Sequence, residues 1–397
     1  AGRNLIYALR DSQGQVRRGT RGVLDIAHGF YTDLFTSEGT DAQVQDELLD
    51  SLTATLTPES RDMCDAVITR EELAESLGTL QNGKSPGMDG FPAEFWKYFW
   101  GEVSADFYEV VQWIHRTGSL TKSMAGGIIR LLHKKGDRLD VRNYRPISLI
   151  NADYKIISKA VARRMARVLP DLISEDQTCV PGRNIADNIH ILRDVVEWCD
   201  GTGTGGAIVF LDQEKCFDRV EHSFVFKCMA KMGYGEDFIK WARIFYNGVH
   251  SRVLVNGEMS DLIQIGRGNR QGDSPSSHIY VMVAEVLASR IRQNPNIRGI
   301  QVAGTEKKVG GYADDTQCFV SSEESLGHLL SEIRLYERAS GSKLNRAKTE
   351  GLWLGRWRGR GDKPYGFTWK STRLKVLGVW IGDGTVGAAN FAEQYVS

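Results

Sequence analysis

Hydrophobic residues recur every three or four positions in five stretches of the chain, and this spacing predicts amphipathic helices. The stretches are 23–35, 69–82, 156–169, 185–199 and 321–341. Thr69 with Glu72, and Ser321 with Glu324, have the spacing of capping boxes. We therefore expect two of these helices to begin at Thr69 and Ser321, and Gly341 to end the last one.

Short apolar runs without helical spacing predict strands. They lie at 128–132, 143–149, 207–211, 253–255, 262–265 and 374–382. Asn256-Gly257 follows one of these runs and is a strong hairpin-turn signal. The run 207–211 is continuously apolar, which indicates a buried strand, and Asp212 follows it directly. This strand is expected to deliver a carboxylate at its end.

A further hairpin is expected around Tyr312-Ala313-Asp314-Asp315, because apolar and β-branched residues flank it on both sides. Gly310, Gly311, Asp314 and Asp315 supply turn chemistry, which places two carboxylates at the tip. Adjacent acids on a turn either cap backbone N–H groups or bind a divalent cation, and the hairpin alone leaves both uses open. Asp212 adds a third acid. A strand-borne aspartate with an Asp-Asp hairpin is the ligand set expected of a two-metal nucleotidyl transferase.

Three motifs carry a resemblance to a known family. They are Leu-Asp-Gln-Glu-Lys-Cys-Phe-Asp-Arg-Val at 211–220, Arg-Gln-Gly at 270–272 and Tyr-Ala-Asp-Asp at 312–315. The chain resembles the reverse transcriptase domain of a non-LTR (LINE-type) retrotransposon polyprotein, from about Val23 to Gly382. The resemblance implies RNA-directed DNA synthesis, with an RNA template, a DNA primer or target, and deoxynucleotides (dNTPs) as partners.

The fold implied by the resemblance is an α+β right-hand polymerase whose antiparallel palm sheet carries the acids. Residues 1–68 would form an N-terminal extension or linker, 69–200 the fingers and 201–340 the palm with its metal site. Residues 341–397 would form the end of the palm, a primer-grip-like hairpin and the start of a truncated thumb. Asp212, Asp314 and Asp315 would be both catalytic residues and metal ligands. Two Mg²⁺ ions would be the cofactor, with Mn²⁺ as an alternative.

The resemblance also assigns residues to the substrates. Those expected at the nucleotide are Lys134, Arg145, Phe217, Gln271, Gly272 and Lys348. Those expected at the template or primer are Lys84, Arg183, Arg270, Tyr312 and Gly378. Arg offers a planar fork and Lys a point charge to phosphate, and an aromatic ring at Phe217 would exclude a ribose 2′-hydroxyl. Solvated surface lysines and core aromatics remain the alternatives at these positions.

The motifs depart from the family pattern at three places. Asn269 stands where Val or Ile is usual, Ser274-Pro275 where Pro-Leu is usual, and Cys216 where Ala is usual. A polar Asn in an apolar slot costs about 1 kcal/mol or more when it is unpaired. The shifted proline is expected to alter the turn, whereas the small change to Cys216 is expected to be tolerated.

The formal net charge is zero, which argues against a generic nucleic-acid binder, but the charges are unevenly distributed. Residues 121–170 hold twelve bases and three acids, and residues 340–375 hold ten bases and two acids. Three of these bases, Arg163, Arg164 and Arg167, are expected on the outward face of the helix 156–169. Two basic blocks beside an acidic site suit phosphate binding, although solvated helix faces give similar counts.

Six scattered cysteines without C-x-x-C spacing support neither a disulfide framework nor a zinc site, and they suit a reducing compartment. No long apolar run or signal sequence is seen, so we expect no membrane contact. We expect an intracellular protein, nuclear and cytoplasmic by resemblance. A start at Ala1 suggests a fragment, and the oligomeric state is not predicted.

Three rival functions stay open. A group II intron-type reverse transcriptase shares the carboxylates but lacks the Gln-Glu-Lys pattern after Asp212. A metal-dependent nuclease would use clustered acids without needing Phe217 or the Arg-Gln-Gly loop. A truncated, catalytically impaired remnant would bind nucleic acid without polymerising.

Overall fold

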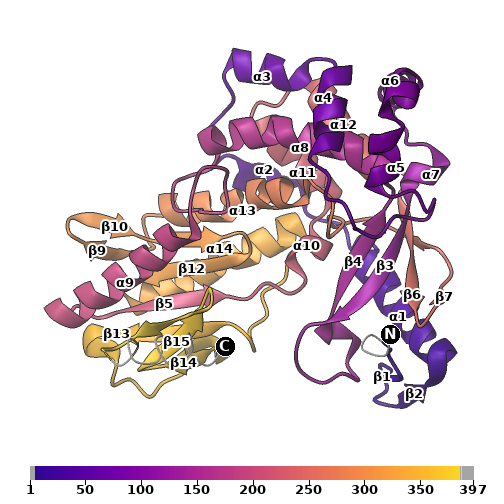
Figure 1. Cartoon of the computed structure of the whole chain (residues 1–397). Coiled ribbons are helices and arrows are strands. Elements are labelled where there is room, and N and C mark those ends of the chain that lie inside the picture. Colours follow the sequence, from indigo (N-terminus) through magenta and orange to yellow (C-terminus); the bar gives the residue numbers. More distant parts are fainter. Residues whose placement is uncertain (1–4, 385, 387–397) are drawn as a thin grey trace. The chain divides into compact units, whose positions relative to one another are not determined.

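The computed structural model describes residues 5–384 and 386, which form two units that are discontinuous in sequence (Figure 1). Unit 1 runs to Gly39 and then takes in Leu56–Val168 and Phe217–Ile279. Unit 2 takes in Thr40–Thr55, Leu169–Cys216 and the chain from Tyr280. This partition differs from the linear boundaries expected at residues 200 and 340. The segment 217–279 belongs to unit 1, and no change in composition along the sequence indicates where this segment starts or ends.

Unit 1 contains a five-stranded sheet centred on β3 (Gly126–His133). This strand pairs antiparallel with β4 (Tyr144–Ile150) and parallel with β6 (His250–Val255). Strand β6 pairs in turn with β7 (Glu258–Met259) and β8 (Ile263–Gln264). Asn256 and Gly257 form the turn between β6 and β7 with φ values of 51° and 95°. The hairpin predicted at Asn256-Gly257 is therefore confirmed.

The chain segments before, between and after these strands form the helices of unit 1. They are α1 (Gly19–Phe35), α3 (Pro58–Asp65), α4 (Arg70–Gly78), α5 (Ala93–Tyr98), α6 (Trp100–Thr117), α7 (Lys122–Ala125), α11 (His222–Lys231) and α12 (Glu236–Tyr246), with the small hairpin β1 (Ala8–Arg10) and β2 (Val16–Arg18) at the start. Three more helices, α8 (Ala152–Leu172), α10 (Cys216–Arg219) and α13 (Ser276–Gln293), begin in one unit and end in the other. The capping box of Thr69 and Glu72 is confirmed, but α4 ends at Gly78, four residues before the predicted stop.

Arg164 corrects one of the predictions for α8. Its side chain is buried instead of pointing outward, and it forms an ion pair with Glu72 at 2.6 Å. Its guanidinium also donates to the carbonyl oxygens of Cys64, Ala66 and Val67. A buried arginine needs such acceptors, so the side chain joins α8 to the segment before α4. The periodicity of the apolar residues does not reveal this partner.

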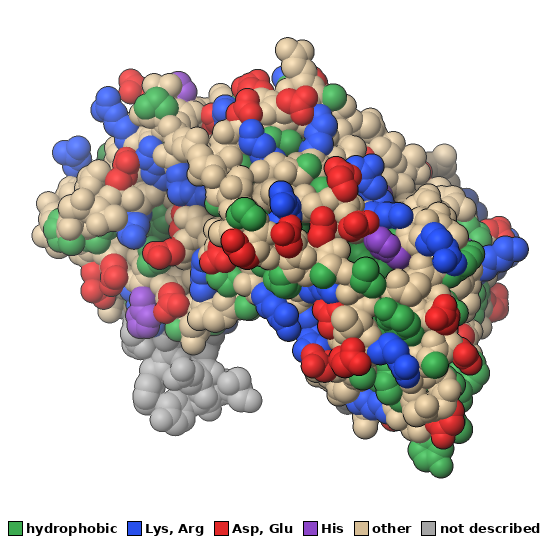
Figure 2. Space-filling model, turned by 90° about the horizontal axis from the view of Figure 1, so that it is seen from above, with side chains coloured by type: hydrophobic (Ala, Val, Ile, Leu, Met, Phe, Trp, Pro, Cys, Tyr) green, Lys and Arg blue, Asp and Glu red, His purple; other side chains and the backbone are tan. Residues whose placement is uncertain are grey.

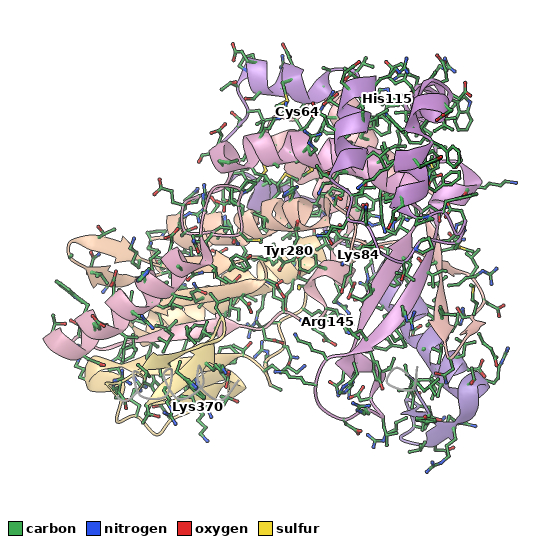
Figure 3. All side chains as sticks on the ribbon, in the orientation of Figure 1. Cys64, Lys84, His115, Arg145, Tyr280 and Lys370 are labelled. Carbon is green, nitrogen blue, oxygen red and sulfur yellow. The ribbon has the colours of Figure 1, made fainter. Side chains whose placement is uncertain are left out.

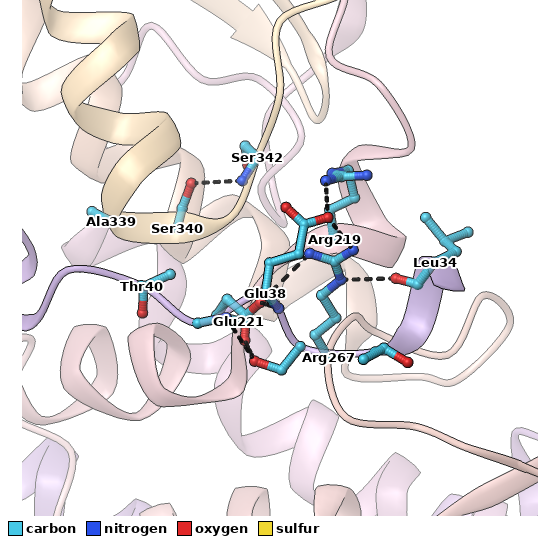
Figure 4. Close-up of polar contacts among 12 residues, drawn as sticks. Leu34, Glu38, Thr40, Arg219, Glu221, Arg267, Ala339, Ser340 and Ser342 are labelled. Carbon is cyan, nitrogen blue, oxygen red and sulfur yellow. Dashed lines mark hydrogen bonds and ion pairs between the residues drawn. The ribbon is translucent and has the colours of Figure 1, made fainter. Parts of the chain in front are cut away.

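A second buried arginine, Arg267, holds the end of α1 within unit 1 (Figure 4). Its Nε donates to the carbonyl oxygen of Leu34 at 2.8 Å, and its Nη2 lies 3.0 Å from a carboxylate oxygen of Glu38. Arg219 reaches the same oxygen of Glu38 at 2.8 Å, and Glu221 lies 3.6 Å from Arg267. This ionic cluster ties α1 to the chain on both sides of α11.

Unit 2 is built on a five-stranded sheet in the order β11-β12-β5-β13-β14. The strands are β11 (Val309–Tyr312), β12 (Asp315–Val320), β5 (Gly206–Leu211), β13 (Glu350–Leu354) and β14 (Thr368–Lys370). All pairs are antiparallel except β13 with β14. Five of the six residues of β5 are buried, as its continuous apolar sequence predicted.

The remaining elements of unit 2 are α2 (Ala42–Leu49), α9 (Ile185–Thr202), α14 (Glu323–Ser340) and the hairpins β9 (Ile300–Val302) with β10 (Thr305–Lys307) and β15 (Arg373–Val376) with β16 (Val379–Gly382). A hydrophobic core joins α9 to β5, β12, β13 and the β15–β16 hairpin. The cap of α14 is Ser322, one residue after the predicted Ser321, and Gly341 ends this helix in the left-handed conformation as predicted. Among the described helices, none has the length and apolarity that a membrane crossing requires.

Candidate active site

The strand register of unit 2 brings the three predicted acids to one edge of its sheet. Thr316 pairs with Leu211 across β12 and β5, so the next residues along the antiparallel ladder, Asp315 and Asp212, are neighbours. Asp314 precedes Asp315 on the turn. We call Asp212, Asp314 and Asp315 the acidic edge.

The turn that presents Asp314 has only two residues. Tyr312 pairs with Asp315, which leaves Ala313 and Asp314 as the loop, and Ala313 has a φ of 53°. The predicted hairpin is confirmed. Gly310 and Gly311, expected to supply turn chemistry, instead lie within β11. A Cβ at Gly311 would lie 3.3 Å from the carbonyl oxygen of Asp315, which is a tight contact.

Asp212 is fixed by the segment that precedes β13. Its carbonyl oxygen accepts from the backbone N–H of Asn345 at 2.8 Å, and its own N–H donates to Oγ1 of Thr349 at 3.3 Å. Glu214 N–H donates to the carbonyl of Lys343 at 2.8 Å. Lys348 lies in this same segment with an exposed side chain. Lys348 therefore lies in a segment whose residues Asn345 and Thr349 are hydrogen-bonded to the main chain of Asp212.

Cys216 does more than replace an alanine. Its Sγ donates to Oδ2 of Asp314 at 3.3 Å. Tyr280 lies on α13 (Figure 3), and its hydroxyl is 3.4 Å from Oε1 of Gln213. Burial raises the pKa of Tyr280 well above its ordinary value, so the hydroxyl stays protonated. The Cys216 thiol is a hydrogen-bond donor to Asp314, one of the predicted metal ligands, and the sequence prediction missed this role.

Carboxylate oxygens are the donors that Mg²⁺ prefers, so the chemistry of the acidic edge and its strand register suit a divalent cation. As the side chains of the described residues stand, no three His, Cys, Asp or Glu groups are arranged to hold a metal ion. Asp314 is instead bonded to the Cys216 thiol. Metal binding at this edge therefore requires side-chain rotation about a backbone that already aligns the acids.

The Arg-Gln-Gly loop, residues 270–272, belongs to unit 1. Nε2 of Gln271 donates to both carboxylate oxygens of Asp218, each at 3.0 Å, and Asp218 is buried. Gly272 is exposed with a φ of 104°, a conformation that favours glycine. Asp218 is part of the motif at 211–220, but the sequence gives no sign of its pairing with Gln271.

Arg270 does not lie where the prediction placed it. It is buried, with its guanidinium 4.5 Å from the ring centre of Tyr154 and 3.3 Å from the carbonyl oxygen of Phe245. The Tyr154 hydroxyl donates to Asp273 at 2.6 Å. Arg270 therefore packs inside unit 1 and does not present a charge to a template. The likeness of the motif could not show on which side of the loop this side chain lies.

Asn269 is buried and paired, so the cost expected for an unpaired amide does not arise. Its Oδ1 accepts from the Tyr246 hydroxyl at 2.6 Å, and its Nδ2 lies 3.5 Å from the carbonyl oxygen of Ser276. Helix α13 begins at Ser276.

Arg183 also has structural partners. Its guanidinium donates to the carbonyl oxygens of Ser174, Gln177, Pro170 and Ile173, at 2.5 to 3.1 Å. Arg183 therefore joins the last turn of α8 to the chain that follows it, and its contact with a template stays a prediction.

The other predicted residues occupy exposed or half-buried positions. In unit 1, Lys84, Lys134 and Arg145 are exposed, and Phe217 is half-buried on α10; Figure 3 labels Lys84 in the loop before α5 and Arg145 on β4. In unit 2, Tyr312 is half-buried and Gly378 is exposed at the turn of the β15–β16 hairpin, with a φ of 84°. On the face shown in Figure 2, basic and acidic side chains are interspersed.

Comparison with known proteins identifies the family of the chain. Residues 132–381 match the family model described as reverse transcriptase (RNA-dependent DNA polymerase). Over 96% of its length the chain is 30% identical to the "Transposon TX1 uncharacterized 149 kDa protein" of Xenopus laevis, of which it covers 29%. It is 23% identical to the "Retrovirus-related Pol polyprotein from type-2 retrotransposable element R2DM" of Drosophila melanogaster, over 71% of the chain and 26% of that protein.

A third relative is the "Probable RNA-directed DNA polymerase from transposon BS" of Drosophila melanogaster, 28% identical over 47% of the chain and 21% of that protein. The chain thus spans less than a third of each of these relatives. The resemblance to non-LTR retrotransposon polyproteins is confirmed, and the chain belongs to the reverse transcriptase (RNA-dependent DNA polymerase) family, as a domain of the LINE type.

Proposed function

We propose that this chain polymerises DNA on an RNA template by joining dNTPs to a primer 3′-hydroxyl. The observation that carries the proposal is the register of β5 and β12, which sets Asp212 beside Asp315 with Asp314 on the adjoining turn. The chain belongs to a family of RNA-dependent DNA polymerases and brings three acids to one edge of a sheet, and metal-assisted nucleotidyl transfer accounts best for these two findings together.

Asp212, Asp314 and Asp315 would hold two Mg²⁺ ions, or Mn²⁺. When bound, the ions supply activation of the primer hydroxyl and charge neutralisation on the triphosphate. The protein's own contribution is alignment. The backbone bonds of Asp212 to Asn345 and Thr349 fix the position of its main chain, from which the carboxylate extends. Lys348, exposed in the same segment, is proposed to neutralise the leaving pyrophosphate.

We propose nucleotide contacts for three polar residues within unit 1. Arg145 and Lys134 lie on and next to the β3–β4 pair, where we propose the fingers bind the triphosphate. Because Asp218 holds Nε2 of Gln271, the carbonyl oxygen of that amide is left to accept a hydrogen bond from the nucleotide. Phe217 would exclude the ribose 2′-hydroxyl, and the sheet of unit 2 would be the palm.

Primer extension on poly(rA)/oligo(dT) with Mg²⁺ tests this function. The wild-type chain should incorporate dTTP, and Asp314→Asn should not. Asp194→Asn is the matched control, because Asp194 is an exposed acid on α9 of the same unit. Binding of the primer–template by the wild type without incorporation would overturn the proposal and favour a remnant that only binds nucleic acid.

A further inference from the structure

The chain from Asp176 to Cys179 lies along the free side of β11, within unit 2. Gly311 N–H donates to the carbonyl oxygen of Asp176 at 2.9 Å, and Thr178 N–H donates to the carbonyl oxygen of Gly311 at 2.8 Å. Gln177 and Gly311 form a parallel bridge. This short segment therefore continues the sheet for one more position beyond β11, immediately before the turn that bears Asp314.

Gln177 uses its side chain to hold that turn. Its Oε1 accepts from the backbone N–H of Ala313 at 3.0 Å, and its Nε2 donates to the carbonyl oxygen of Ala313 at 3.3 Å. The same Oε1 accepts from the N–H of Cys179 at 3.0 Å, which orients the amide. Both polar groups of one backbone residue are thus bound by one side chain.

Ala313 needs such support because its φ of 53° lies in the left-handed region. A residue with a Cβ pays about 1 kcal/mol or more there, and the conformation persists only when its surroundings impose it. Ala313 directly precedes Asp314, so its backbone angles set the direction in which that carboxylate leaves the sheet.

The segment that carries Gln177 is itself held from behind. Arg183 donates to the carbonyl oxygen of Gln177 at 2.8 Å and to that of Ser174. Asp176 forms an ion pair with Arg292 of α13 at 2.9 Å. The main chain of Gln177 is therefore held by Arg183, and the preceding residue by the ion pair of Asp176 with Arg292, so the segment that bears the Gln177 amide is fixed on both counts.

We propose that Gln177 is a positioning residue for the acidic edge, which fixes the left-handed Ala313 and through it the carboxylate of Asp314. The proposal rests on the function proposed above, because it gives the aligned acids their purpose. Replacing the amide should let the turn relax toward ordinary backbone angles. A displacement of about 1 Å in a reacting group lowers turnover by about 100-fold.

Gln177→Met removes both bonds to Ala313 and keeps the length of the side chain. We expect kcat for primer extension to fall by about 10- to 100-fold while the KM for the primer–template stays within about two-fold. Gln317→Met is the matched control. Gln317 is a buried glutamine on β12 of the same hairpin, and its Nε2 bonds Asn188 on α9. It should affect stability without a comparable loss of kcat.

Hydrogen exchange of the Ala313 amide in the full chain, labelled with ¹⁵N-alanine, tests positioning without relying on activity. Ala313 should exchange at least 10-fold faster in Gln177→Met than in the wild type, and at the wild-type rate in Gln317→Met. Gln177→Glu retains the acceptor for the Ala313 N–H and should restore most of the protection.

Equal Ala313 exchange in wild type and Gln177→Met would overturn the positioning role, whether or not the protein polymerises. Absence of incorporation by the wild type would instead overturn the proposed function and leave the exchange result standing. A kcat loss in Gln177→Met that Gln317→Met matches would also count against positioning, since it would reflect general destabilisation.

Discussion

The acidic edge of unit 2 and the Arg-Gln-Gly loop of unit 1 both carry polar motif residues, yet the two regions hold them differently. At the acidic edge the main chain does the positioning, through strand pairing and the backbone bonds of Asp212. In the loop the side chains make the connections: Arg270 is buried against Tyr154, and the half-buried Gln271 is bonded to the buried Asp218.

This difference teaches which substitutions separate chemistry from folding. Carboxylates at the acidic edge are exposed or half-buried, so their replacement leaves the ladder of strands intact. In and behind the loop, Asp218, Asn269 and Arg270 are buried, and their replacement leaves polar partners without bonds inside unit 1. We therefore expect substitutions of the acidic-edge carboxylates to lower catalytic activity alone. Substitutions of the buried residues in and behind the loop should lower stability or substrate affinity.

The largest effect is expected for Asp212→Asn. Loss of a carboxylate that we propose binds the metal ions should lower kcat by about 1,000-fold or more, equivalent to about 4 kcal/mol of barrier. The urea midpoint should stay within experimental error of the wild type, because the backbone bonds of residue 212 do not depend on its side chain. A large loss of stability would remove the distinction between the two regions.

Asp218→Asn should raise the KM for dNTP by about 10- to 100-fold, since a hydrogen bond to a charged partner contributes about 1.5 to 3 kcal/mol. The amide of residue 218 offers only one acceptor to Gln271 and so permits the Gln271 amide to turn. Steady-state kinetics measures the effect. In a Gln271→Ala background the substitution should change KM by less than about two-fold, and an undiminished effect there would show that Asp218 acts through another residue.

Asp153, buried on α8 in unit 1, gives a pH-dependent test. Burial, with a smaller effect of Asp89, raises the pKa of Asp153 to about 6 from an ordinary value of 3.8. The folded state thus favours the protonated acid, and this stabilisation is lost as the pH rises from about 4 to 6.

The Asp153→Asn substitution replaces the carboxyl group with an amide, which does not titrate. The free energy of unfolding of Asp153→Asn relative to wild type should therefore increase by about 2 to 3 kcal/mol between pH 4 and pH 7.5. Urea unfolding at both pH values provides the measurement. A difference that does not vary with pH would show that Asp153 is not held in its protonated form.

The smallest effect is expected from restoring the family's usual residue at position 269. Asn269→Val leaves the Tyr246 hydroxyl without its bond and should cost about 1 to 2 kcal/mol of unfolding free energy, although Val is the commoner residue. Combined with Tyr246→Phe, the cost should shrink, because both polar partners are then removed. Additive costs in urea unfolding would rule out this pairing.

The sequence predicted the secondary-structure elements that depend on local hydrophobic periodicity and turn residues. The strand that ends just before Asp212 and the Tyr312–Asp315 hairpin both follow from local apolar runs and turn residues. These patterns did not predict partners far apart in the chain, such as Arg164 with Glu72 or Gln177 with Ala313. The contacts of Arg183 and Arg270 were missed for the same reason: a motif identifies a residue but not the carbonyl or ring that its side chain contacts after folding.

Anomalous diffraction from crystals of the full chain with an RNA template, a DNA primer and a dNTP analogue in Mn²⁺ tests the central claim most directly. The account predicts Mn²⁺ bound by the carboxylates of Asp212 and Asp314, with the Cys216 thiol displaced from Asp314. Mn²⁺ bound away from these carboxylates, in a complex that still extends its primer, would contradict it.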